Sequence, residues 1–148
     1  MKAKSGFTLV EILIVVVILG ILAAIVIPQF TEASTEAKTS SLCTDLQTMR
    51  SQIELYKIQH NDVLPGNGTG GATFEQSLIG YTNIAGAVQA GPGANIYGPY
   101  IQKIPTNQFN DLNTINFNGT VGDGGSGWEF NTTTGAFQAD DNAAHAAL

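Results

Sequence analysis

The feature that most constrains this chain is an apolar run near its N-terminus. Ile12 to Ile27 contains sixteen residues without a polar side chain, and several apolar residues precede it. With these neighbours the segment reaches the ~20 residues that a membrane-spanning helix needs. One acid, Glu11, directly precedes the run, although an ionised acid within a bilayer costs about 2.5–3.5 kcal/mol on insertion scales. We therefore expect a membrane helix whose acid needs a partner.

Two ordinary interpretations leave this acid unexplained. In a cleaved secretory signal, Lys2 and Lys4 would form the basic region, and a cut after residues 31–33 would give a mature chain that starts at Ser34. In a plain membrane anchor, the same lysines would keep the N-terminus in the cytoplasm. Neither interpretation uses Glu11.

A third interpretation gives the acid a role. A cut between Gly6 and Phe7 would create an α-amino group four residues before Glu11, which is about one helical turn. In a bundle of identical helices, the amine of one copy could then neutralise the acid of its neighbour. A buried charge that only another copy can satisfy would set the register of assembly.

The string KSGFTLVEILIVVVILGILAAIVIPQF resembles the N-terminus of type IV pilins and of the pseudopilins of type II secretion systems, and most of all that of a major pseudopilin. The resemblance implies that Gly6 ends a leader peptide and that Phe7 is methylated after cleavage. It also implies that Glu11 is the assembly acid. Gly20 and Pro28 would be the positions where the helix loosens in a packed filament, in keeping with their poor fit to helices.

The helix is expected to continue well beyond the apolar run. The chain has no Gly or Pro between Pro28 and Pro65, and one apolar stripe recurs at helical spacing: Leu42, Leu46, Met49, Ile53 and Tyr56. This stripe is predicted to contact the domain that follows. The predicted organisation is a leader (1–6), a transmembrane or filament-core segment (7–30), an amphipathic second half of the helix (31–62) and a loop-rich globular domain (63–148).

The globular domain is predicted to be α+β. Thr73 and Gln76 fit a capping box at the start of a short helix. Alternating residues predict strands within 115–118, 127–131 and 135–139, the last two joined by a hairpin loop at 131–135 in which Gly135 is left-handed. The expected fold class is pilin-like: a long N-terminal helix packed on a small C-terminal antiparallel sheet with long loops.

Composition excludes several functions. After Gly6 the chain has 4 basic and 12 acidic side chains, a net charge of −8, so nucleic acid is not an expected partner. The single cysteine, Cys43, cannot form an intramolecular disulfide and is predicted to be a packing residue or a bystander. His60 and His145 are predicted to be solvated surface residues. No Gly-Lys dipeptide is present, so any ATP-driven step would come from a partner.

The C-terminal region raises the question of a metal. The resemblance implies a calcium site in the C-terminal loops, for which the candidates are Asp111, Asp123, Asp140 and Asp141. Their spacing matches no EF-hand loop, and the alternative is a set of solvated acids. The nearby GDGGSG segment, residues 122–127, is predicted to be a flexible turn rather than the surroundings of a catalytic serine. No other cofactor and no enzymatic activity are expected.

The resemblance implies a structural subunit of a type II secretion system. The chain would start in the bacterial inner membrane, with its N-terminus cytoplasmic and its C-terminal domain periplasmic, and then enter a periplasmic filament. Its partners would be further copies, minor pseudopilins, the prepilin peptidase that also methylates, and the assembly platform with its ATPase. The alternatives are a type IV pilin of a surface fibre and a secreted domain with an ordinary signal peptide. The single cysteine favours the pseudopilin, because type IV pilins commonly carry a C-terminal disulfide.

Overall fold

The computed structural model describes residues 6–148, so most of the leader predicted at residues 1–6 lies outside the described residues. The chain divides into two compact units, one up to Thr39 and the other from Ser40 to Leu148. We refer to the second unit as the body. This boundary lies inside the long N-terminal helix, so the part of the helix from Ser40 onwards belongs to the body.

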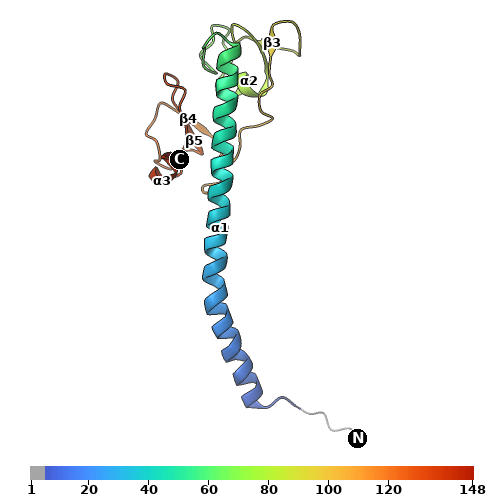
Figure 1. Ribbon diagram of the computed structural model, residues 1–148, viewed down its shortest axis with the longest axis vertical. Coiled ribbons are helices and arrows are strands. Elements are labelled where there is room, and N and C mark those ends of the chain that lie inside the picture. Colours follow the sequence, from blue (N-terminus) through green and yellow to red (C-terminus); the bar gives the residue numbers. More distant parts are fainter. Residues whose placement is uncertain (1–5) are drawn as a thin grey trace. The chain divides into compact units, whose positions relative to one another are not determined.

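The predicted long helix is confirmed as α1, Leu9–Gln59, which is continuous through Gly20 and Pro28 (Figure 1). Pro28 has no N–H to donate to the carbonyl four residues earlier. Just beyond it, Thr31 Oγ1 donates to the carbonyl of Ile27 at 3.2 Å. The loosening expected at Gly20 and Pro28 concerns the packed filament and stays a prediction.

The body contains two short helices and two three-stranded sheets beside the C-terminal half of α1 (Figure 1). The elements in chain order are α2 (Phe74–Ile79), β1 (Tyr81–Asn83), β2 (Val88–Gln89), β3 (Ile96–Tyr97), β4 (Ile115–Phe117), β5 (Trp128–Phe130), β6 (Phe137–Ala139) and α3 (Ala143–Ala146). The first sheet has the order β2-β1-β3 and the second has the order β4-β5-β6.

The α+β layout is confirmed, with two differences from the sequence prediction. The β5–β6 hairpin is antiparallel, but β4 pairs with β5 in parallel. The parallel pairing is possible because residues 118–127, here called loop 118–127, carry the chain back to the end of the sheet where β4 began. The first sheet was not predicted, and it lies in a region expected to form loops. Its strands are only two or three residues long, which is too short to produce a recognisable alternating pattern.

The core of the body forms where the helix stripe meets the second sheet. All five stripe residues are buried, and they cluster with Trp128, Phe130 and Phe137 from β5 and β6 and with Phe74 and Leu78 from α2. Burial of this apolar surface is the main stabilising term of such a fold. The capping box at Thr73 is also confirmed, with both of its hydrogen bonds formed.

The prediction that His60 is a solvated surface residue is wrong. The side chain is 1% exposed. It stacks on Tyr56 with ring centroids 3.8 Å apart, and Tyr97 packs against its edge. Its Nδ1 lies 2.9 Å from the carbonyl of Tyr56 and its Nε2 lies 3.0 Å from Thr82 Oγ1. Because a carbonyl only accepts, Nδ1 carries a proton and donates it to the carbonyl of Tyr56.

Candidate functional site

The first candidate site is the start of α1, where Thr8 and Glu11 form a reciprocal capping box. The Glu11 backbone N–H donates to Thr8 Oγ1 at 3.2 Å. In return, Glu11 Oε2 accepts from the backbone N–H of Thr8 at 2.8 Å and from its hydroxyl at 3.0 Å. The acid therefore stabilises the first helical turn of its own chain. Glu11 Oε1 has no hydrogen bond among the described residues, so it is available to a cation from another chain.

The surface around this turn is apolar and exposed. Phe7 is 84% exposed, and every large hydrophobic residue from Leu9 to Ile27 is more than 40% exposed. Within α1, an 18-residue window with a mean hydropathy of 3.3 has no buried residue, so the helix is apolar and long enough to cross a membrane. Such a surface is stable in water only when lipid or other protein covers it.

The second candidate site is the pair of buried acids beneath loop 118–127. Asp140, the residue after β6, is fully buried, and its carboxylate accepts from three donors of this loop. Its Oδ1 accepts from the N–H of Gly122 at 2.7 Å, whereas its Oδ2 accepts from the N–H of Ser126 at 3.2 Å and lies 2.6 Å from Ser126 Oγ. The predicted turn at residues 122–127 is confirmed, but Ser126 within it is buried and hydrogen-bonded rather than free in solvent.

Glu129, in the middle of β5, is the other buried acid. Its side chain is 2% exposed, its Oε1 accepts from the N–H of Gly119 at 2.5 Å, and its Oε2 is buried without a partner. Burial raises the pKa of the Glu129 carboxyl, the Gly119 bond lowers it, and the negative charges of Asp140 and Asp123 raise it further. This residue was not among those predicted from the sequence.

The four aspartates of the calcium hypothesis do not converge. Asp141 accepts from Asn107 at 2.9 Å and lies 2.5 Å from the ring of His145, while Asp123 accepts from the N–H of Gly125 at 2.8 Å. Asp111 is exposed, in a left-handed turn. Within residues 6–148 no three His, Cys, Asp or Glu side chains are grouped so that they could hold a metal. The donor set thus fits calcium poorly, and the calcium hypothesis stays untested.

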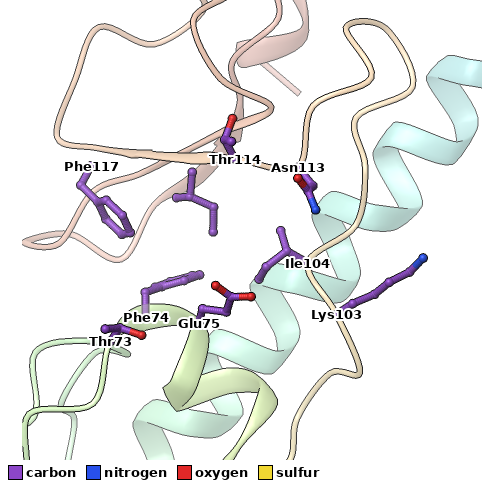
Figure 2. Close-up of a pocket in the computed structure, with 9 residues that line it drawn as sticks. Thr73, Phe74, Glu75, Lys103, Ile104, Asn113, Thr114 and Phe117 are labelled. Carbon is purple, nitrogen blue, oxygen red and sulfur yellow. The ribbon is translucent and has the colours of Figure 1, made fainter.

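The body also has a groove of about 550 Å³ between the start of α2, the chain at Lys103 and Ile104, and the strand β4 with the residues before it. Figure 2 shows Phe74, Ile104 and Phe117 pointing into this space, whereas the amine of Lys103 points away from it. Its titratable side chains are Glu75 and Lys103, and no nucleophile with an adjacent base lines it. The groove therefore has the character of a contact surface rather than a catalytic centre.

Comparison with known proteins adds to this geometry. Residues 1–27 match the family model described as a prokaryotic N-terminal methylation motif. The type II secretion system core protein G of Klebsiella pneumoniae is 34% identical over 107 residues, which cover 71% of this chain and 69% of that protein. The chain belongs to this core protein G family. Its long alignment includes much of the body as well as the N-terminal helix.

Other relatives of this G-family chain match over shorter stretches. The core protein G of Pseudomonas aeruginosa is 42% identical over 59 residues, or 40% of this chain and 42% of that protein. A fimbrial protein of Pseudomonas aeruginosa is 34% identical over 64 residues, or 43% of this chain and 42% of that protein. The chain thus spans less than half the length of these two relatives. No solved structure matches the chain.

The structure places Gly6 and Phe7 just before α1 and Glu11 in its first turn, and the roles expected of these residues stay predictions. The sequence analysis did not name the partners of the acids. Apart from Gly6 and its chain neighbours, no residue of the described part of the chain has an atom within 4 Å of a Cβ built on Gly6. Thr8 could have been found, because Thr followed by Glu three residues later is a capping-box pattern. No sequence pattern indicated that Glu129 is buried. Alternating apolar and polar residues predict a strand with one solvent-facing side, but they do not show that a loop covers that side.

Proposed function

We propose that this chain is a structural subunit of a type II secretion system that polymerises into a periplasmic filament. The observation that carries the proposal is the alignment to the Klebsiella pneumoniae core protein G over 71% of the chain, which extends well beyond the N-terminal helix. The names of the relatives denote a secretion component or a fimbrial protein, and none of them denotes an enzyme. The mechanism we propose is assembly without catalysis.

The proposed sequence of events follows from the first turn of α1. Before assembly, the apolar half of α1 lies in the inner membrane, with the body on the periplasmic side. A prepilin peptidase cuts before Phe7 and the new amine is methylated. The platform and its ATPase then move the subunit into the filament, where Glu11 neutralises the amine of an adjacent copy. Contacts among the apolar helices supply most of the cohesion, and minor pseudopilins are the other expected filament partners.

The alternative is a type IV pilin of a surface fibre used for adhesion, motility or DNA uptake. The fimbrial relatives support it, but they match only 43% of this chain. A secreted domain with an ordinary signal peptide is a weaker alternative, because residues 1–27 match the methylation motif.

Deletion of the gene in the native cell tests the proposal. We expect secretion of a reporter protein to stop, and we expect electron microscopy of wild-type cells to show no long surface fibres that depend on the gene. Normal secretion together with the loss of such fibres would favour the pilin.

Intact mass of the protein extracted from membranes tests the processing step. We expect a chain that begins with N-methyl-phenylalanine at residue 7. A chain that begins at Ser34 would contradict both filament proposals.

A further inference from the structure

Loop 118–127 is organised by one residue from outside it, Asp140. The carboxylate of Asp140 accepts from the N–H groups of Gly122 and Ser126 and lies 2.6 Å from the hydroxyl of Ser126. The backbone of Asp140 holds the loop as well. Its carbonyl accepts from Gly124 at 2.7 Å and its N–H donates to Gly127 at 3.2 Å. A single buried residue therefore fixes the loop at four positions along its length.

The loop is also packed too closely to change its path easily. Gly122 has a φ of +79°, and a Cβ built on it would lie 2.8 Å from the backbone of Ala143 at the start of α3. A Cβ built on Gly127 would collide with the carbonyl oxygen of Leu112. At both positions only glycine fits, because any side chain would collide with backbone atoms.

Both carboxylate oxygens of Asp140 are thus engaged by donors of the protein itself. Calcium requires six to eight oxygen ligands, usually with several carboxylates among them. A cation bound at Asp140 would have to displace hydrogen bonds that already balance the buried charge. Asp111, Asp123 and Asp141 give no help, because they do not form a ligand group with Asp140 within the described residues.

We propose that hydrogen bonds from loop 118–127 to Asp140 replace a structural calcium in this member of the family, so that the loop folds without the metal. Asp140 is then the positioning residue of the loop, and the N–H groups of Gly122 and Ser126 provide the positive partial charge that a cation would otherwise provide. The inference concerns folding, so it does not depend on the proposed filament function.

Thermal unfolding of the full-length protein in detergent micelles tests the inference. Trp128 is the single tryptophan of the chain and is fully buried directly after the loop, so its fluorescence reports on this region. We expect the same unfolding midpoint in excess calcium and in excess chelator. Asp140→Asn should lower the midpoint by roughly 5 °C or more in both conditions. The NH₂ group of the new amide would face N–H or O–H donors of the loop, so hydrogen bonds to this side chain would be lost.

Two further variants keep the test decisive. Asp123→Asn is the matched control, because this exposed aspartate makes one hydrogen bond within the loop, and its midpoint should stay within about 2 °C of wild type. Ser126→Ala is the milder variant if Asp140→Asn does not fold, and it should lower the midpoint equally with and without calcium.

Two results would overturn the inference. One is a wild-type midpoint that falls by several degrees when calcium is removed, with Asp140→Asn, Ser126→Ala or Glu129→Gln abolishing that difference. Glu129→Gln belongs in this set because Glu129 Oε2 is the buried carboxylate oxygen without a partner in the described chain. The other result is an Asp140→Asn protein that unfolds at the wild-type temperature.

Discussion

The two buried acids of the body, Asp140 and Glu129, differ in how many hydrogen bonds their carboxyl groups receive. Asp140 receives three hydrogen bonds from loop 118–127, which engage both of its carboxylate oxygens. Glu129 receives one from Gly119 and has an unpartnered oxygen. Burial and the charges of Asp140 and Asp123 raise the pKa of Glu129, so the folded protein binds this proton more tightly than the unfolded chain does.

The pH dependence of stability should reveal this acid. Because the folded-state pKa of Glu129 is raised, the folded protein holds this proton more tightly than the unfolded chain. The resulting stability is present below the unfolded pKa and is lost as pH rises through the folded one. Glu129→Gln cannot titrate and should therefore gain stability relative to wild type as pH rises from acid to neutral, by about 1.4 kcal/mol for each unit of pKa difference.

Unfolding midpoints of both proteins across this pH range measure the effect, with Glu75→Gln as the control. Glu75 is an exposed acid in the first turn of α2, so its substitution removes one carboxyl group without disturbing the core. A constant difference between Glu129→Gln and wild type at all pH values would contradict the assignment.

At the scale of elements, α1 combines two surfaces with different requirements. Its first half is apolar all round and exposed, whereas its second half buries one stripe against α2, β5 and β6. The stripe also explains why the helix extends so far beyond a membrane span. Tertiary packing of an amphipathic face, rather than helix propensity, supplies most of the stability of such a helix.

Truncation within the stripe should destabilise the body far more than truncation on the opposite face. Leu46→Ala removes a side chain that is 1% exposed, so we expect a loss of about 2–5 kcal/mol in the free energy of unfolding. Ile58→Ala is the matched control on the same helix, because Ile58 is 74% exposed and its loss should change stability by no more than about 0.5 kcal/mol. Trp128 fluorescence in denaturant measures both, and equal losses would show that the stripe is not the core contact.

At the scale of the whole molecule, the assembly hypothesis rests on Glu11. In the single chain this acid caps its own helix through Oε2, and its other oxygen makes no hydrogen bond within the described residues. An acid held in one position by Thr8 can meet the amine of a neighbour without a large loss of side-chain freedom. The capping box and the proposed pairing between copies are therefore compatible.

Glu11→Ala should insert into the membrane normally and fail to assemble. Loss of one member of a buried ion pair costs about 3–5 kcal/mol, which corresponds to a reduction of roughly hundredfold or more in the affinity of a subunit for the filament. Glu32→Ala is the control, because Glu32 is an exposed acid on the same helix. Sheared filaments and membrane fractions, quantified by immunoblotting, measure the two pools. Filaments of Glu11→Ala at the wild-type level would refute the role of this acid.

The sequence alone determined the parts of this protein that depend on local pattern. The length of α1, its buried stripe, the capping box of α2 and the β5–β6 hairpin follow from periodicity and from residue types at fixed offsets. The N-terminal signature indicated a resemblance that type IV pilins and pseudopilins share. The tertiary structure decided which polar groups are buried. His60, Ser126 and Glu129 carry no local mark of burial, because the segments that cover or bond them, at Thr82, Asp140 and Gly119, are distant in sequence or lie across a loop. For the same reason, the parallel pairing of β4 with β5 and the separation of the four aspartates became visible only in the fold.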